Sequence, residues 1–393
     1  MNKDLRYFPL EEYEQRWQRV QQAMAQRDID IAVVWSRSAG TYDRCADLLY
    51  LANYYGNQPG QGRRGPAGFA AAILRPGRPP QLFADVNDPR PELIATTDIT
   101  ACANTIDAVA GELCALGRRR VALVGSDLMP MKYWAQLQTG APDIEWVIED
   151  QLIGDLRLIK SDRELDAFRR AGEIVSEALT VSMQLLAAGK PESEAAAEAA
   201  KIVYRGGGHI HMVPISHGPY LQHLATDPLP GFSHLSPAPG DLARIWITGP
   251  MFQGYWLGPG RTVVSGNRPT PAQRHLLEAN AGAVDGIIAA IRPGMTVREL
   301  VAEGDAYSDA FDGEPSELSK QWPLYGHGNG LFFEAPTLST KVGSDADMVL
   351  RENMVISIEV FFNLAGVGSA GFENNVIISA TGPELLSTAP MFV

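Results

Sequence analysis

Two glutamates lie inside apolar runs near the end of this 393-residue chain, and they constrain its fold more than any other feature. Glu359 follows the run 355–358, and Glu373 lies in the run 372–378. Both runs have the β-branched and aromatic composition of strands. A glutamate in a buried strand is costly unless it is paired or binds a ligand. The pattern therefore favours strands that carry both carboxylates to one site over edge strands that face water.

A histidine between glycines precedes these strands. His327 lies in the sequence Y-G-H-G-N-G-L of residues 325–331, where glycine lets the backbone approach a ligand closely. In this order and at this spacing, His327, Glu359 and Glu373 resemble the creatinase/prolidase/methionine aminopeptidase family of pita-bread hydrolases. The similar motifs extend over most of residues 157–390. The resemblance implies a pita-bread domain with a catalytic site at these three residues.

The metal-binding hairpin of that family is altered in this chain. Metal-dependent members carry two aspartates there, in patterns like G-D-L-x-x-x-D-x-G and G-Y-x-x-D-x-x-R-T. Residues 240–249 read G-D-L-A-R-I-W-I-T-G, and residues 254–262 read G-Y-W-L-G-P-G-R-T. Trp246 and Gly258 therefore stand where the resemblance places the carboxylates.

The altered hairpin argues against a dinuclear metal centre. Such a centre needs about five ligands, mostly oxygens. His327, Glu359 and Glu373 supply three, whereas an indole cannot ligate a metal and Asp241 belongs to a turn. We expect no cofactor and no tightly bound metal, although a single weakly held ion stays open. Creatinase departs from the family at the same positions, and the resemblance implies metal-free chemistry on a guanidino compound.

Without a metal, the two glutamates repel each other. At least one carboxyl pKa should rise, and the two groups should titrate as a pair. An amidinium, guanidinium or ammonium group would relieve the repulsion by charge and by hydrogen bonding. The sequence thus predicts a substrate with a cationic nitrogen.

Histidines are concentrated before the hairpin, and a histidine there moves protons in the resembled family. His223 follows G-P-Y-L-Q and is the preferred candidate, with His234 second. A histidine titrates near neutrality, which suits general acid–base catalysis. His209 and His211 alternate on a predicted strand, and we expect them to be a packed or solvated pair.

Other residues are expected to line the pocket. The loop after His327 is one residue shorter than the family's H-G-x-G-L-x-x-H-E-x-P and lacks its second histidine. Glu334 remains as a possible third carboxylate. Aromatic side chains would favour a cation, although each could equally belong to the core. They are Trp246, Trp256, Phe332 and Phe333.

Two arginine positions could support substrate binding. Arg261 matches the R-T of the family pattern. Arg63 and Arg64 lie in the Gly/Pro-rich loop 54–66, and a loop of this length is often functional. In creatinase-like dimers such a loop reaches the partner's site and binds the substrate carboxylate. We therefore expect a homodimer, with Arg64 near the partner's pocket or simply solvated.

The periodicity of the chain predicts two domains. Helical patterns at 9–27 and 107–116 alternate with strand patterns at 31–35, 68–74, 81–84 and 120–124, which indicates an α/β domain over residues 1–155. Capping boxes then begin helices at Ser161, Thr270 and Thr296. We expect residues 156–393 to form an α+β domain of the pita-bread type, with helices on a largely antiparallel sheet.

Composition excludes some partners. The formal net charge is −13, which argues against nucleic acid and anionic membranes. The three cysteines have neither metal nor disulfide spacing and are expected to be reduced thiols. No signal core precedes the first domain and no run could span a bilayer, so a cytoplasmic protein is expected.

Together these features predict a hydrolase that cleaves a C–N bond in a small amino-acid-derived substrate without a metal. His223 or His234 would move protons, Glu359 and Glu373 would bind the cation, and His327 would assist. Three alternatives remain open: an Xaa-Pro-type metallopeptidase with a rebuilt single-metal site, a lyase on the same fold, and an inactive binding protein.

Overall fold

The fold divides into two compact units, Met1–Arg157 and Leu158–Val393, within two residues of the boundary expected from the sequence. The computed structural model describes residues 5–37, 45–56, 68–85, 90–227 and 233–392. Among these residues, no helix has both the length and the apolar character needed to cross a membrane.

The first unit is built on a six-stranded mixed sheet with the order β4-β3-β2-β1-β5-β6. The central strand β1 pairs antiparallel with β2 and parallel with β5, and β1 is buried along almost its whole length. The strands are β1 (Ile31–Arg37), β2 (Phe69–Leu74), β3 (Gln81–Asp85), β4 (Ile99–Cys102), β5 (Arg120–Val124) and β6 (Glu145–Ile148). The helices are α1 (Leu10–Gln26), α2 (Ala46–Ala52), α3 (Thr105–Leu116), α4 (Met131–Gly140) and α5 (Gln151–Arg157). This is the α/β domain predicted.

The second unit contains a large sheet with the order β14-β13-β15-β16-β11-β8-β7, in which the paired strands are antiparallel. Two short strands flank it, β12 beside β15 and β17 beside β16, and β9 pairs separately with β10. The strands are β7 (Ile215–His217), β8 (Leu242–Trp246), β9 (Gly249–Phe252), β10 (Tyr255–Leu257), β11 (Gly260–Val264), β12 (Glu314–Pro315), β13 (Gly326–Asn329), β14 (Phe333–Thr337), β15 (Val355–Leu364), β16 (Gly368–Ser379) and β17 (Gly382–Leu385).

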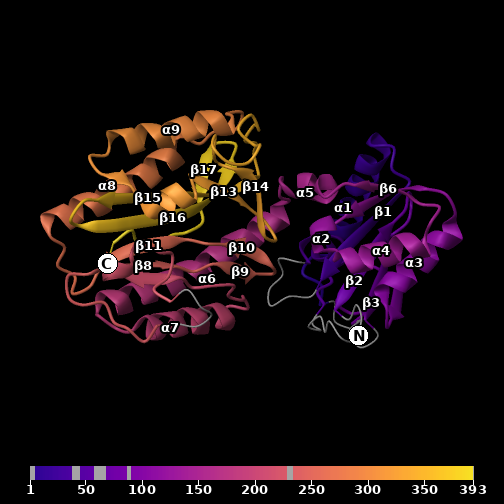
Figure 1. The fold of residues 1–393 in the computed structure, drawn as a ribbon, viewed down its shortest axis with the longest axis horizontal. Coiled ribbons are helices and arrows are strands. Elements are labelled where there is room, and N and C mark those ends of the chain that lie inside the picture. Colours follow the sequence, from indigo (N-terminus) through magenta and orange to yellow (C-terminus); the bar gives the residue numbers. More distant parts are fainter. Residues whose placement is uncertain (1–4, 38–44, 57–67, 86–89, 228–232, 393) are drawn as a thin grey trace. The chain divides into compact units, whose positions relative to one another are not determined.

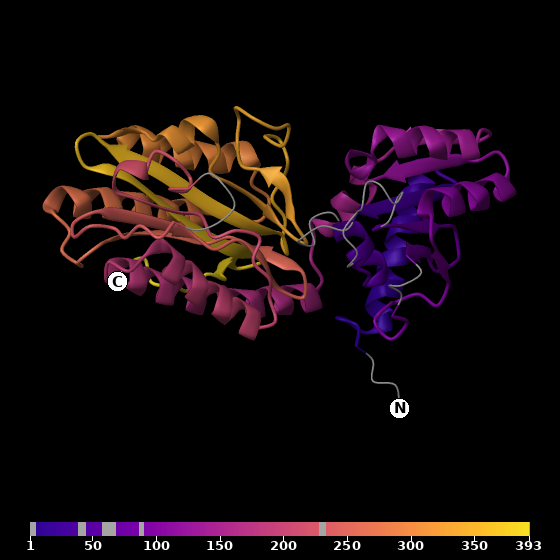
Figure 2. The same ribbon diagram turned by 60° about the horizontal axis from the view of Figure 1, so that its bottom comes forward.

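Helices cover both sides of this sheet. Figure 1 shows α8 beside β15 and β16 with α9 packed on α8, and α6 beside β8 and β11 with α7 packed on α6; Figure 2 gives a second view of the same layers. The helices are α6 (Asp162–Ala187), α7 (Glu192–Arg205), α8 (Pro271–Ala290), α9 (Val297–Ala310) and the short α10 (Glu317–Gln321). Capping boxes begin three of them at Ser161, Thr270 and Thr296, as predicted, because each side-chain oxygen accepts from the backbone of the first turn.

The strand predicted across His209 and His211 is wrong. The backbone there is irregular, although His209 N donates to Pro250 O and His211 N donates to Thr248 O. Only an isolated bridge from Met212 to Thr248 has strand geometry. Three glycines precede this segment, and the last allows a close approach, because a Cβ on Gly208 would lie 2.3 Å from Met251 O. Most of the predicted loop 54–66 lies outside the described residues.

Arg261 anchors the end of the chain. Its buried guanidinium donates to the carbonyl oxygens of Glu373, Ala389 and Pro390 at 2.6, 2.9 and 3.2 Å, and to Asn374 Oδ1 at 2.7 Å. These contacts fasten the C-terminal segment to β11 and β16. Arg261 thus has a structural role, and its guanidinium is engaged by protein oxygens rather than offered to a substrate.

The Arg261→Met variant should lose about 3 kcal/mol of unfolding free energy, because buried carbonyl oxygens would lose their donor. Chemical denaturation followed by circular dichroism measures this loss. Arg169→Met is the matched control, since Arg169 forms an exposed ion pair with Glu384 and should contribute about 1 kcal/mol or less. Equal losses in the two variants would contradict the anchoring role.

Candidate functional site

The two glutamates face each other across neighbouring strands. Glu359 on β15 is paired with Glu373 on β16, Glu373 is paired with Gly260 on β11, and Gly260 is paired with Trp246 on β8. Directly paired residues project from the same face of a sheet. Neighbours in sequence such as Ile358 and Phe372 project from the opposite face into the core beneath α8. The row from Trp246 to Glu359 therefore lies on the face of the sheet away from α8.

A second row lies beside the first on this face. Asn375 is paired with Ser357, and Ser357 is paired with His327 on β13. Because alternate residues of a strand share a face, this row accompanies Glu373 and Glu359. The structure thus brings His327, Glu359 and Glu373 together on one surface, as the sequence predicts.

Trp246 occupies a slot beside Glu373. Its Nε1–H donates to Glu373 Oε2 at 2.6 Å, and its ring stacks on Phe361 with centroids 5.2 Å apart. Glycines make room for the indole, because a Cβ on Gly260 would lie 2.0 Å from the ring and one on Gly371 would lie 2.7 Å from it. A hydrogen-bond donor therefore fills this side of Glu373.

Gly258 also faces Glu373 but offers no ligand. A Cβ at this position would lie 3.5 Å from Glu373 Oε1 and 3.2 Å from Thr248 Oγ1. Over the described parts of the chain, no three His, Cys, Asp or Glu side chains are grouped so that they could hold a metal ion. The residues at the site therefore do not fit a dinuclear centre.

The two carboxyl groups have different surroundings. Glu373 accepts from Trp246 and from Asn375 Nδ2 at 3.3 Å, and Ser357 adds a further hydrogen bond. Burial raises the pKa of Glu373 to about 7, although these donors stabilise its anion. Burial, together with the nearby Glu373 charge, raises the pKa of Glu359 well above its usual range. Glu373 is therefore the first of the pair to lose its proton as the pH rises, and Glu359 is the group that retains one.

His327 is a neutral imidazole beside aromatic rings. Its Nδ1 lies 3.1 Å from the carbonyl oxygen of Gly328, which leaves Nε2 as an acceptor. Burial lowers the pKa of His327. The Phe333 ring lies 4.3 Å from the imidazole, and Trp256 contacts both Phe333 and Phe332. The predicted aromatic residues are therefore divided into two groups, Trp246 beside Glu373 and the other three beside His327.

Glu334 is not a free third carboxylate. Its Oε2 lies 3.0 Å from Lys160 Nζ, and both side chains are almost fully buried. Its Oε1 accepts from the backbone N–H of Leu331. This ion pair connects two segments 174 residues apart in sequence, so no local pattern revealed it. The contact of Glu334 with substrate stays a prediction, for a carboxylate that is already paired with Lys160.

The two candidate histidines lie in different places. His234 is exposed, and its Nδ1 is 3.0 Å from Ser193 Oγ at the start of α7. His223 is also exposed, but the adjacent Leu224 packs against Trp246 and Phe361. The geometry favours His223, and both roles stay predictions. Arg64 lies outside the described residues, so its role and the predicted homodimer are untested.

A polar network behind Glu373 was not predicted from the sequence. Asn329 Nδ2 and Asn375 Nδ2 both donate to Ser357 Oγ, at 2.8 and 2.6 Å, and all three residues are buried. The signal was present, because Ser357 and Asn375 lie two residues from the glutamates and thus share their face of the sheet.

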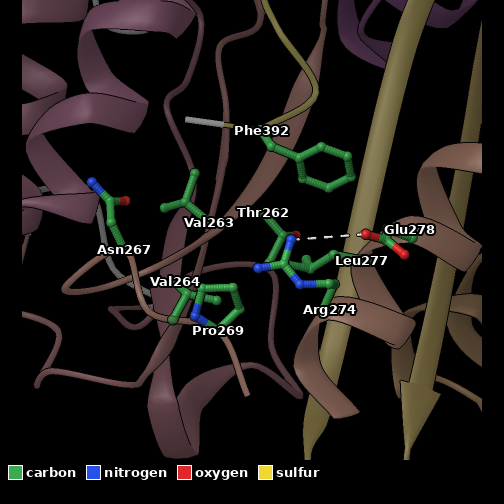
Figure 3. A pocket seen from close by; sticks show the side chains of 9 residues that line it. All are labelled: Thr262, Val263, Val264, Asn267, Pro269, Arg274, Leu277, Glu278 and Phe392. Atoms are coloured by element: carbon green, nitrogen blue, oxygen red, sulfur yellow. Dashed lines mark ion pairs between the residues drawn. The ribbon is translucent and has the colours of Figure 1, made fainter. Parts of the chain in front are cut away.

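A crevice between β11 and α8 is a separate feature. Figure 3 shows this hollow of about 200 Å³, in which Arg274 and Glu278 form an ion pair at 3.9 Å. Both side chains are exposed, and solvated pairs of this kind contribute little. The buried carboxylates, with their shifted pKa values, make the stronger candidate for a functional site.

Comparison with known proteins identifies relatives of the chain. The Xaa-Pro dipeptidase of Pyrococcus furiosus is 28% identical over 257 residues, which cover 61% of this chain and 65% of that protein, slightly less than two thirds. A probable dipeptidase of Mycobacterium tuberculosis is 28% identical over 280 residues, or 70% of each chain. These relatives are named as dipeptidases, so they do not support the creatinase type expected from the sequence.

Solved structures and a family model agree on the fold. The structure of the Xaa-Pro dipeptidase from Bacillus anthracis has a TM-score of 0.76 at 20% identity and covers 97% of this chain and 100% of that one. This likeness confirms the predicted α/β domain followed by a pita-bread domain. Residues 166–380, more than half of the chain, match the model of metallopeptidase family M24. The chain therefore belongs to metallopeptidase family M24.

Proposed function

We propose that this chain hydrolyses a C–N bond in a small amino-acid-derived substrate, with a hydrogen-bonded carboxylate pair in place of a dinuclear metal centre. The observation that carries the proposal is the 2.6 Å hydrogen bond from Trp246 to Glu373. The names of the relatives favour a dipeptide over the guanidino compound expected from the sequence. A dipeptide retains the predicted cationic nitrogen, because its N-terminus is an ammonium group.

The carboxylate pair would bind that ammonium. With one proton on Glu359, the pair carries one negative charge, which one cation neutralises. Glu373 would accept a hydrogen bond from the ammonium, whereas Glu359 could donate its proton in a hydrogen bond to the substrate carbonyl. Such a donor stabilises negative charge that develops on the carbonyl oxygen during attack.

Hydrolysis also needs proton transfer at the water and at the leaving nitrogen. His223 would take a proton from the attacking water and return it to the nitrogen as the C–N bond breaks. The water oxygen is retained in the new carboxyl group, so the atoms balance. The neutral Nε2 of His327 would help to orient the water or the substrate. The aromatic residues beside His327 would contact an apolar part of the substrate.

A second candidate is a dipeptidase with a single metal ion. It is favoured by the relatives' names and by the retention of His327, Glu359 and Glu373, which would be the ligands. A metal ion there would polarise the substrate carbonyl. This candidate requires Trp246 to release Glu373, whereas the carboxylate-pair mechanism uses the hydrogen bond as it stands.

Metal analysis separates the two candidates. We expect purified protein to contain much less than one equivalent of transition metal, and chelation to leave hydrolysis of an Xaa-Pro dipeptide panel unchanged. In H₂¹⁸O, mass spectrometry should find one ¹⁸O atom in the product acid; an unlabelled product would indicate elimination. The variant Trp246→Asp with Gly258→Asp should gain metal binding by calorimetry, whereas Trp246→Phe should not. Stoichiometric metal and loss of activity on chelation would establish the metal-dependent candidate instead.

The role of His223 is tested by substitution. His223→Ala should lower kcat by about 10²–10⁴-fold, the usual contribution of a general acid–base. His209→Ala and His234→Ala serve as controls and should change kcat little. A fully active His223→Ala enzyme with an impaired His234→Ala enzyme would transfer the role to His234.

The carboxylate pair makes stability depend on pH. The pKa of Glu373 rises from its ordinary value of 4.5 to about 7 on folding, so the folded state holds its proton more tightly. The favourable contribution of Glu373 to the free energy of unfolding is complete below about pH 4.5, and it is lost as the pH rises through 7. Glu373→Gln and Glu359→Gln should therefore match or exceed the wild-type melting temperature at pH 8, with a smaller advantage at pH 5.

Thermal unfolding from pH 5 to 8 tests this pH dependence, with the exposed Glu352→Gln as control. Each site variant should also weaken binding of a cationic dipeptide analogue, by roughly 1.5–3 kcal/mol for a lost charge-assisted hydrogen bond. If both variants melt well below wild type at every pH, an internal cation holds the carboxylates and the proposed ammonium site fails.

A further inference from the structure

A compact loop carries His223 next to the carboxylate site. We call residues 215–226 the His223 loop. Its ends are joined by a hydrogen bond from Thr226 N to Ile215 O at 2.8 Å, and His223 N donates to Tyr220 O at 2.9 Å. The loop begins with β7, the edge strand that pairs with β8, and β8 ends at Trp246. The loop and the carboxylate site are therefore connected through a single strand.

A buried cation binds the middle of this loop. Arg244 is fully buried, and its Nη2 lies 3.0 Å from Leu221 O, 2.7 Å from His223 O and 3.2 Å from Ser216 Oγ. In the described part of the chain, no Asp or Glu forms an ion pair with this guanidinium. A buried charge without an opposite charge is costly, so the loop oxygens supply most of its compensation.

A buried anion binds both ends of the same loop. Glu192, at the start of α7, is 3% exposed at its side chain, and its Oε1 accepts from His217 Nδ1 and Thr226 Oγ1, each at 2.6 Å. Ser233 adds a further hydrogen bond, and burial raises the pKa of Glu192. Like Arg244, Glu192 makes its hydrogen bonds with atoms of the His223 loop. It has no direct role in the proposed hydrolysis.

The loop is also packed against the site itself. Leu224 contacts the cluster of Trp246 and Phe361, and Arg244 Cζ lies 5.8 Å from the ring centroid of each aromatic residue. Trp246 in turn donates to Glu373. A continuous series of contacts thus joins the backbone of His223 to the carboxylate.

We infer that Arg244 and Glu192 are positioning residues that fix the His223 loop, and with it His223, against the Trp246–Glu373 site. The inference rests on the proposed role of His223 in proton transfer. The cation fixes the middle of the loop through carbonyl oxygens, and the anion fixes its ends through side-chain donors. Arg244 is buried with no carboxylate partner among the described residues, and Glu192 is buried with His217 and Thr226 as its donors, so opening the loop would expose both side chains.

Backbone hydrogen exchange of the His223 and Thr226 amides tests the inference directly. Arg244→Gln, Glu192→Ala and Thr226→Val should each accelerate exchange in the loop at least 10-fold, whereas amides of β16 should exchange as in wild type. Glu192→Gln should restore slow exchange, because its amide oxygen still accepts from His217 and Thr226. Thr180→Val is the matched control for Thr226→Val, since the Thr180 hydroxyl bonds only within α6.

Activity supplies a second readout. In the loop-loosening variants kcat should fall at least 10-fold with KM little changed, and Glu192→Gln should recover most of kcat. Thr226→Val keeps both buried charges and so remains informative if the other variants unfold. Wild-type exchange in Arg244→Gln and Thr226→Val, or accelerated exchange with unchanged kcat, would overturn the inference. Exchange requires no substrate, so its result is independent of the assays that test the proposed hydrolysis.

Discussion

The repulsion between two neighbouring carboxyl groups, one buried and one half-buried, is the constraint on which the site depends. Register places Glu359 and Glu373 directly opposite each other on neighbouring strands. Such a pair cannot remain doubly ionised in a buried setting, so a proton, a cation or hydrogen-bond donors must relieve it. Among the described residues, the hydrogen bonds that relieve it are donated to Glu373, by Trp246, Asn375 and Ser357. Because of these donors, Glu373 ionises more readily and Glu359 keeps its proton more readily. Acid–base catalysis requires this division of roles.

The placement of Trp246 beside Glu373 depends on several other positions. The indole needs space above Gly260 and Gly371 and a stacking surface on Phe361. A Cβ at either glycine would overlap the ring, so the tryptophan and its slot form one packing unit. The hydrogen bond to Glu373 is then a consequence of where the slot holds the ring. This unit occupies the side of the site where the resembled metal-dependent pattern places an aspartate.

Membership in a metallopeptidase family therefore does not determine the reaction of this chain. The fold is shared with a solved Xaa-Pro dipeptidase, as the TM-score of 0.76 indicates. Chemistry depends instead on a few side chains that project from the large sheet. Two buried side chains, Arg244 and Glu192, bind the His223 loop, which carries the candidate proton carrier.

Local patterns in the sequence determined the helix starts at Ser161, Thr270 and Thr296, because a capping box needs only four residues. They also determined the strands around Glu359 and Glu373, since an apolar β-run is a local signal. Only the tertiary structure decided which side chains pair across the fold. It bound Glu334 to Lys160, directed Arg261 to the C-terminal carbonyls, and placed Leu224 beside Trp246. Those partners are distant in sequence, and register and packing of the whole domain bring them together.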